Sequence, residues 1–189
     1  MTTPATNAQH PDTFSEVSIG PSPVMTEANS LAVKSLYDLI AQQPFFKGLN
    51  VHQLQLLTDS AMEMQFEAGQ KIFQEGSSAN RFYLILEGKV VLESELAEHN
   101  VIPIQTLSAG DDLGWSWLFP PYVLHSSARA LEPTRTIFFY GTRLREQCEI
   151  DHDLGYQLMR RIAEVLIQRL QTTQHRLMEH IVTNRLSKI

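Results

Sequence analysis

The sequence predicts an α+β protein: an antiparallel β-roll of the jelly-roll or double-stranded β-helix type, with short helices before it and one long helix after it. Three observations predict this fold. Between residues 64 and 140, short runs of β-branched and aromatic residues alternate with turns that contain glycine. Apolar residues on either side of this stretch recur at the spacing of an α-helix. After Gly141 this spacing continues well beyond the length of an average globular helix, which is about 11 residues.

The composition is that of a folded, acidic globular protein. The chain has 189 residues, of which 43% are hydrophobic and 19% charged, and its formal net charge is -6. An acidic protein is a poor general binder of nucleic acid, because such binding depends on clustered Lys and Arg. Cys148 is the sole cysteine, so no intrachain disulfide can form. Residues 1–30 lack a signal pattern, and no segment approaches the ~20 apolar residues of a membrane span, so we expect a cytoplasmic protein.

The chain is expected to contain three parts. Residues 1–29 are rich in Thr, Pro, Ser and Asn and poor in large apolar residues, which predicts a disordered tail. Residues 30–143 hold two short helices and the roll. The first helix begins after the capping residue Ser30 and ends at Pro44, and the second shows apolar spacing from Val51 to Met62. Residues 144–189 are expected to form the long C-terminal helix.

Turns that contain glycine divide the roll into strands. Gly69, Gly76, Gly88 and Gly110 each lie where a tight turn needs a positive φ, which glycine adopts without steric cost. The expected strands are residues 71–74, 82–86, 90–93, 101–107, 126–131 and 136–140. Strands this short, at this spacing, are typical of a sandwich or a barrel-like roll.

An apolar stripe follows the long C-terminal helix. It comprises residues at steps of three and four, with Thr173 as a polar member: Leu158, Ile162, Leu166, Leu170, Leu177 and Ile181. About 35 residues at roughly 1.5 Å each exceed ~50 Å, so the helix is expected to project beyond one small domain. Its stripe needs a partner, and a second copy of the chain is the simplest one, so we expect a homodimer.

Three local strings resemble those of a known family. Pro44-Phe45-Phe46 stands before the roll, residues 66–76 (FEAGQKIFQEG) are expected to form its first hairpin, and residues 82–90 (FYLILEGKV) follow. The strings and their order resemble the effector domain of the Crp/Fnr superfamily and, more broadly, the cyclic nucleotide-binding domains of kinase regulatory subunits and gated channels. The resemblance covers residues 45–181, and it implies a ligand-binding β-roll followed by a dimerisation helix.

The same resemblance implies a phosphate-binding cassette between residues 110 and 130. In the family, a Gly-Glu turn and a following Arg hold the ribose and the phosphate of the ligand. Here Trp115 stands at the place of the Glu. Leu124 and His125 stand at the places of the Arg and its neighbouring Ser, to within one residue, because the loop is shorter. The frame of the cassette is therefore present without its two charged anchors.

The candidate ligand-binding residues come from the cassette and from the long helix. In the cassette they are Gly114, Trp115, Ser116, Trp117, Leu118, His125, Ser126, Ser127 and Arg129, and on the helix the resemblance implies Thr173 and Gln174. Arg129 either supports the cassette by hydrogen bonds or contacts an anion directly. Trp115 and Trp117 either stack on a ligand or fill the pocket themselves. Thr173 either contacts a base or sets the register of a dimer.

No pattern in the sequence predicts catalysis, a metal site or a cofactor. The seven histidines lack the spacing of metal ligands, and no nucleophile elbow, Walker loop or dinucleotide fingerprint occurs. His125 or Cys148 as a haem ligand is disfavoured, because an isolated His or Cys is more often a packing or surface residue. We therefore expect a protein that is not an enzyme.

The sequence predicts a homodimeric regulatory module that senses a cyclic nucleotide or another small anionic ligand and signals to a separate protein partner. The family's transcription factors continue into a helix-turn-helix domain, and this sequence ends before one, so direct DNA binding is not expected. Membrane association is not expected either. The alternative is a degenerate pocket with no ligand, in a chain that serves as a scaffold or accessory subunit of a larger complex.

Overall fold

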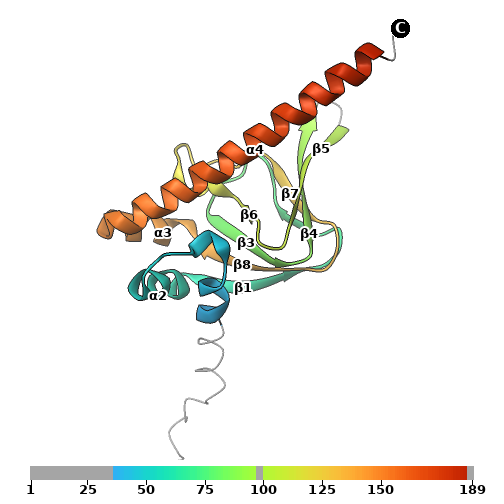
Figure 1. Cartoon of the computed structure of the whole chain (residues 1–189). Helices are drawn as coiled ribbons and strands as arrows, with labels where there is room; N and C mark the ends of the chain where they lie inside the picture. The colour runs from blue at the N-terminus through green and yellow to red at the C-terminus, as the bar shows by residue number, and fades with distance from the viewer. Residues whose placement is uncertain (1–35, 97–99, 187–189) are drawn as a thin grey trace, which may run out of the picture.

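Two antiparallel sheets form a roll, and a long helix lies across it (Figure 1). The structure is a computed structural model that describes residues 36–96 and 100–186. Residues 36–41 are helical. The elements that follow are η1 (Pro44–Phe46), α2 (Val51–Asp59), β1 (Ala61–Phe66), β2 (Lys71–Phe73), β3 (Arg81–Glu87), β4 (Lys89–Leu96), β5 (Asn100–Ser108), β6 (Asp112–Leu113), η3 (Trp115–Leu118), β7 (Ser127–Ala130), β8 (Thr134–Tyr140), α3 (Gly141–Ile150) and α4 (His152–Leu186).

Each of the two sheets contains four strands. One sheet has the order β1-β8-β3-β6 and the other β2-β7-β4-β5, with antiparallel pairing throughout. Apart from the hairpin of β4 and β5, neighbouring strands come from distant parts of the chain, so the chain crosses repeatedly between the two sheets. This arrangement is an antiparallel β-roll, and it confirms the fold class that the sequence predicts. Within the described residues, no helix has the length and apolar content that a membrane crossing requires.

Two hydrophobic cores hold the elements together. The first lies between the two sheets and includes Tyr83, Ile85, Val90, Leu107 and Phe138. The second joins the outer face of one sheet to the helices; its buried members are Ile40, Phe45, Phe46, Leu49, Leu54, Leu57, Ala61, Phe82, Leu84, Trp117, Ile137, Phe139, Leu144, Leu154, Leu158 and Ile162. The start of α4 is therefore part of the domain core.

The predicted apolar stripe on the long helix divides into two parts. Leu158 and Ile162 are buried against the roll, whereas Leu170 is 57% and Leu177 is 59% exposed. Figure 1 shows why, since α4 leaves the helical end of the domain and runs along the roll past β5. The second half of the stripe is therefore uncovered in a single chain.

Three predictions about individual elements are wrong. The second helix ends at Asp59 instead of continuing to Met62, and residues Ala61–Phe66 form β1, which pairs with β8. The two-residue strand β6 was not predicted. The helix predicted from Leu144 onward is two helices, because Asp151 has an extended conformation (φ -108°, ψ 90°). The Asp151 Oδ1 atom accepts a hydrogen bond from the Leu154 amide at 3.0 Å and so starts α4 as a new helix.

The predicted turns agree with the structure. Gly69, Gly76, Gly88 and Gly110 all have φ between 78° and 92°. At Gly88 the requirement is also steric, because a Cβ atom there would lie 2.6 Å from the Pro133 carbonyl oxygen. The predicted tail, residues 1–29, and the final residues 187–189 lie outside the described residues.

Candidate functional site

The predicted cassette is the segment that joins β6 to β7. It starts with Gly114 in the left-handed region (φ 83°), followed by the short helix η3. A Cβ atom at Gly114 would lie 2.8 Å from the Arg81 carbonyl oxygen, so only glycine fits this turn. The segment then passes through a cis peptide bond between Pro120 and Pro121 and returns to the sheet at β7.

Two aromatic rings meet where the resemblance places the ligand anchors. The half-buried Trp115 stacks on the exposed His125, with ring centroids 6.0 Å apart and an interplanar angle of 25°. Leu124 is only 6% exposed, and its amide donates to the Ser77 carbonyl oxygen at 2.9 Å. His125 rather than Leu124 therefore faces Trp115.

The remaining residues of η3 have different environments. Trp117 is fully buried beside Phe82 (ring centroids 6.0 Å apart), and its Nε1 atom has no hydrogen-bond partner among the described residues. Ser116 is also buried. Leu118 lines a groove of ≈ 420 Å³ between η3, α3 and α4. Trp117 is therefore a residue of the hydrophobic core and is not part of the proposed site.

Cys148 lines the same groove as Leu118 but is poorly suited to thiolate chemistry. Burial is the main cause that raises the pKa of its thiol to about 11, and Glu149 and Asp151 add to the effect. The thiol is therefore protonated at neutral pH. Within the described part of the chain, no cluster of three or more His, Cys, Asp or Glu residues could hold a metal ion.

The polar residues of β7 are engaged by neighbouring strands. Ser127 is buried, and its Oγ accepts a hydrogen bond from the Glu75 amide at 3.0 Å, while Ser126 is half-buried. Arg129 forms a two-pronged ion pair with Glu93, with Nε–Oε1 3.2 Å and Nη2–Oε2 2.7 Å. This hydrogen bond raises the pKa of Arg129, and Glu93 is 7% exposed. These contacts favour the supporting role of Arg129 over direct contact with an anion.

The two helix residues implied by the resemblance lie away from the cassette. Thr173 and Gln174 are exposed, and Thr173 Oγ1 donates to the Arg169 carbonyl oxygen at 2.9 Å. The neighbouring Thr172 instead lines a cavity between α4 and the roll. In a single chain, the structure therefore does not bring Thr173 and Gln174 together with Trp115 and His125.

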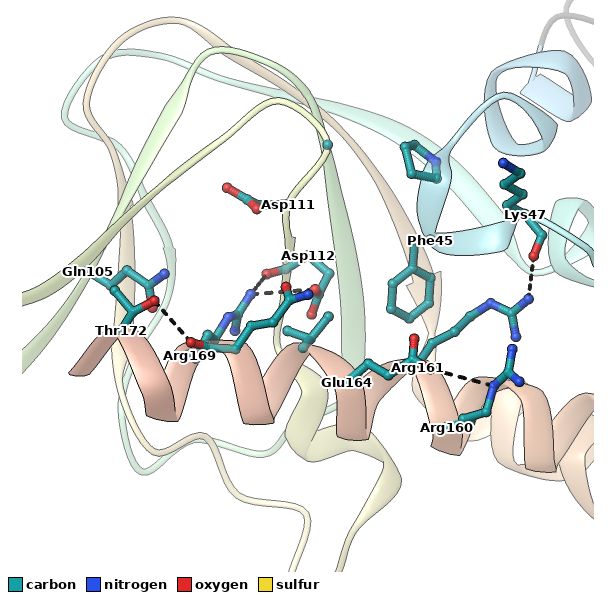
Figure 2. Close-up of a pocket in the computed structure, with 14 residues that line it drawn as sticks. Phe45, Lys47, Gln105, Asp111, Asp112, Arg160, Arg161, Glu164, Arg169 and Thr172 are labelled. Atoms are coloured by element: carbon teal, nitrogen blue, oxygen red, sulfur yellow. Dashed lines mark hydrogen bonds and ion pairs between the residues drawn. The ribbon is translucent and has the colours of Figure 1, made fainter. Parts of the chain in front are cut away.

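That cavity is a feature that the sequence did not predict. It has a volume of ≈ 430 Å³ and lies between α4, η1 and the turn before β6 (Figure 2). Its lining includes Phe45, Lys47, Gln105, Asp111, Asp112, Arg160, Arg161, Glu164, Arg169 and Thr172. These residues come from three distant segments, and only the path of α4 across the roll brings them together.

A buried ion pair inside this cavity links α4 to β6, the strand at the start of the cassette. Arg169 Nη2 lies 3.5 Å from Asp112 Oδ1 and also donates a hydrogen bond to the Asp112 carbonyl oxygen. Burial raises the pKa of the Asp112 carboxyl, and the charge of Arg169 opposes that rise. The Asp112 Oδ2 atom has no hydrogen-bond partner among the described residues. Asp112 lies two residues before Gly114, so the start of the cassette is bonded directly to the long helix.

Two further arginines connect α4 to the rest of the domain. Arg161 Nη2 donates to the Lys47 carbonyl oxygen at 2.6 Å, and Arg176 Nη1 donates to the Ile104 carbonyl oxygen at 3.2 Å. Together with Arg169, these side chains contact the segment before α2, the turn before β6, and β5. The position of α4 is thus defined along most of its described length.

Comparison with known proteins agrees with this architecture. The family model of the cyclic nucleotide-binding domain matches residues 63–151. The crystal structure of a protein from Geobacter metallireducens GS-15, assigned as a cyclic nucleotide-binding protein, is 33% identical with a TM-score of 0.64; the match covers 74% of this chain and 98% of that one. The catabolite activator protein of Thermus thermophilus shares the fold, with 22% identity, a TM-score of 0.58 and coverage of 71% and 61%.

A curated relative is the CRP-like cAMP-activated global transcriptional regulator of Mycobacterium tuberculosis, which is 25% identical over 147 residues. The match covers 78% of this chain but 64% of the regulator, so the chain spans less than two thirds of that protein's length. The fold agrees with the similarity to the Geobacter protein, and the chain belongs to the family of cyclic nucleotide-binding domains.

Proposed function

We propose that this cyclic nucleotide-binding regulatory domain acts as a homodimeric sensor of a small anionic ligand and passes its state to a separate protein partner. The observation that carries this proposal is the bond between Arg169 of α4 and Asp112 at the start of the cassette. A ligand that moves the cassette would also move α4. The contact therefore supplies a physical route from a ligand to the outer surface of the helix.

The exposed face of α4 supports the dimer. Its uncovered apolar side chains are Tyr156, Met159, Ile167, Leu170, Leu177, Met178, Ile181 and Val182. A single chain leaves this stripe in water, which is unfavourable by roughly 25 cal/mol per Å² of apolar surface. Two copies packed along α4 would cover both stripes at once, as in a coiled coil.

The dimer is tested by sedimentation of the wild type and of the double variant Leu170→Glu/Leu177→Glu. We expect the wild type to sediment as a dimer and the variant as a monomer, because each chain would place two carboxylates in the interface. Thr183→Glu, an exposed position on the opposite side of the same helix, is the control and should stay dimeric. A wild type that sediments as a monomer contradicts the dimer.

Cyclic AMP is expected to be a weak ligand. Trp115 offers one N–H donor and no carboxylate, and the His125 imidazole lacks the permanent charge and the five N–H donors of a guanidinium. Each lost charge-assisted contact costs on the order of 2 kcal/mol, so two such losses weaken binding by roughly a thousandfold. The ligand of this domain is therefore another small anion, or cyclic AMP at low affinity.

The cassette assignment is tested by restoring the two charges. Because Trp115 and His125 face each other, Trp115→Glu/His125→Arg should raise the affinity for cyclic AMP by about tenfold or more in titration calorimetry. Trp115→Glu/Leu124→Arg is the matched control, since it places the same charge at a buried position. No gain in either variant would show that the segment does not form a nucleotide cassette.

A second candidate function is that of a scaffold with a closed pocket. Two observations favour it: the Trp115–His125 stack fills the place of the anchors, and Arg129 is already paired with Glu93. Under this alternative, no nucleotide or related anion would raise the melting temperature of the protein, and the protein would co-purify with a defined partner. Saturable binding of a small anion whose affinity changes in Trp115→Glu/His125→Arg rules this alternative out.

A further inference from the structure

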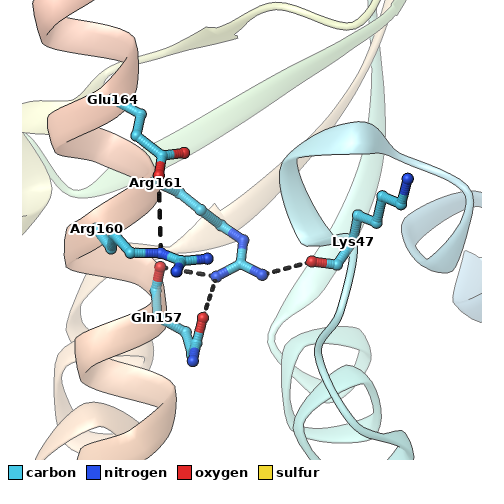
Figure 3. Close-up of polar contacts among 5 residues, drawn as sticks. All are labelled: Lys47, Gln157, Arg160, Arg161 and Glu164. Carbon is cyan, nitrogen blue, oxygen red and sulfur yellow. Dashed lines mark hydrogen bonds and ion pairs between the residues drawn. The ribbon is translucent and has the colours of Figure 1, made fainter.

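Arg161 is a buried cation whose hydrogen bonds all go to neutral groups. It is 7% exposed, and Figure 3 shows it between α4 and the loop that follows η1. Its Nη1 donates to the Gln157 carbonyl oxygen (2.8 Å) and to Gln157 Oε1 (2.9 Å), and its Nη2 donates to the Lys47 carbonyl oxygen (2.6 Å). Among the described residues, Arg161 has no ion pair with a carboxylate. A buried arginine normally has an anionic partner, because taking its charge out of water is costly.

Near Arg161, the positively charged groups of the cavity outnumber the negatively charged ones. Arg160 precedes it on the helix and pairs with Glu164 at 3.7 Å, where both side chains are largely exposed, and Lys47 lies opposite (Figures 2 and 3). Burial, followed by the charge of Arg160, lowers the pKa of Arg161, and the charge of Glu164 opposes this change only in part. Asp112 is bonded to Arg169, and Figure 2 shows Asp111 beyond it, on the side away from Arg161. The local excess of positive charge is therefore at the Arg160–Arg161 end.

The other end of the cavity offers groups that bind hydroxyls. Gln105 and Thr172 lie together at this end, and the Asp112 Oδ2 atom, although buried, has no partner among the described residues. A ligand hydroxyl would satisfy that oxygen. The volume of ≈ 430 Å³ is in the range of small-molecule sites, which is roughly 300–1,000 Å³.

We infer that this cavity is a binding site for a small phosphate-bearing molecule with hydroxyl groups, of the size of a sugar phosphate or a nucleoside monophosphate. The phosphate would contact Arg160 and Arg161, and the hydroxyl-bearing part would extend toward Asp112 and Thr172. Trp115, His125 and Ser127 of the cassette do not line this cavity, so the site is separate from the place where the resemblance puts the ligand anchors. A bound molecule would join α4 to the loop after η1 and so hold the helix in the position seen here.

The test is titration calorimetry of the full chain with adenosine monophosphate, ribose 5-phosphate and adenosine as probes. The two phosphate-bearing probes should bind saturably below about 1 mM and adenosine should not, because the phosphate supplies the missing anion. Arg161→Gln should weaken phosphate-probe binding by about tenfold or more, and the exposed Arg160→Gln by a smaller factor. Arg176→Gln, which removes the same charge from the same helix outside the cavity, should bind as the wild type does.

Arg161→Gln also removes contacts within the protein, so its circular dichroism and melting temperature are measured alongside; if it unfolds, Arg160→Gln decides the matter. Equal binding by the wild type and a folded Arg161→Gln variant overturns the inference. So does binding of adenosine as tight as that of its monophosphate, or absence of saturable binding to either phosphate probe up to about 10 mM. The Leu170→Glu/Leu177→Glu variant should bind adenosine monophosphate as the wild type does, because neither residue lines the cavity, so the result is independent of the proposed dimer.

Discussion

Arg129 forms an ion pair with Glu93, which lies on the neighbouring strand of the same sheet, and this ion pair decides the structural role of Arg129. Arg129 lies on β7 and Glu93 on β4, and the register of β4 shifts at Leu92/Glu93, where a bulge occurs in its pairing with β5. The carboxylate is nearly inaccessible to water, while the guanidinium is 38% exposed. The pair therefore stabilises the sheet chiefly by satisfying Glu93.

We expect Arg129→Met to lower the free energy of unfolding by roughly 2 kcal/mol, because it leaves a buried carboxylate without its partner. Urea denaturation measures this loss. Glu93→Gln/Arg129→Met should recover part of it, since the buried charge is gone. Arg135→Met provides the comparison, because its partner Glu87 is mostly exposed and such pairs contribute about 0–1 kcal/mol. Equal losses in Arg129→Met and Arg135→Met would contradict this account.

The sequence predicted a cassette segment but could not decide the environment of its residues. The position of Trp115 followed from the glycine turn and the spacing of the motif. The partner of Arg129 is 36 residues earlier in the chain, and the contact depends on the register of β4 against β7, in which Arg129 pairs with Val91 and Ser127 with Glu93. Whether Leu124 or His125 faces Trp115 likewise depends on the path of the loop between η3 and β7.

At the level of the elements, the turn between β6 and η3 is more constrained than the turn that precedes β6. Gly110 and Gly114 both have positive φ, at 92° and 83°. A Cβ atom at Gly110 would meet nothing within 4 Å, whereas at Gly114 it would meet the Arg81 carbonyl oxygen at 2.8 Å. Substitutions at Gly110 and Gly114 therefore distinguish the free-energy cost of a positive φ from the cost of steric overlap.

Gly110→Ala should cost about 1 kcal/mol of stability, which is the cost of placing a Cβ in the left-handed region. Gly114→Ala should cost about 3 kcal/mol, because the β-strand that carries Arg81 must also move. Thermal denaturation of the two variants gives the comparison. If the two losses are equal, backbone conformation alone explains both.

The sequence predicted most elements of the roll, because glycine turns and β-branched runs are local signals. It missed β1, since the apolar residues of Ala61–Phe66 continue the spacing of the preceding helix, and their strand partner β8 is more than seventy residues away. It missed β6, which is two residues long and exists through its pairing with β3. It joined α3 to α4, because an aspartate that caps a new helix is difficult to distinguish from one on a helix surface.

At the level of the whole molecule, the roll and α4 meet at a buried carboxylate. Burial raises the pKa of Asp112 above 3.8, so the folded protein binds this proton more tightly than the unfolded chain does. Stability then falls as the pH rises from that unfolded value through the folded pKa, and is regained as the pH is lowered. Ionised Asp112 is thus a cost that Arg169 offsets in part.

Asp112→Asn removes this titration, so its stability relative to the wild type should be more favourable at about pH 7 than at about pH 4. Urea denaturation at the two pH values gives the difference. Asp111→Asn, an exposed neighbour, is the control and should show a smaller change between the same pH values. A relative stability of Asp112→Asn that is the same at both pH values would show that Asp112 does not titrate in this range.

The three arginines of α4 have a consequence for how the protein can change during evolution. Arg161, Arg169 and Arg176 each donate to a main-chain oxygen, at residues 47, 112 and 104. Every amino acid has this main-chain oxygen. Substitutions at the three acceptor positions therefore keep the hydrogen bonds, provided that the backbone path does not change. Conservation is therefore required of the arginine side chains. Related sequences should vary more freely at 47 and 104 than at 161 and 176.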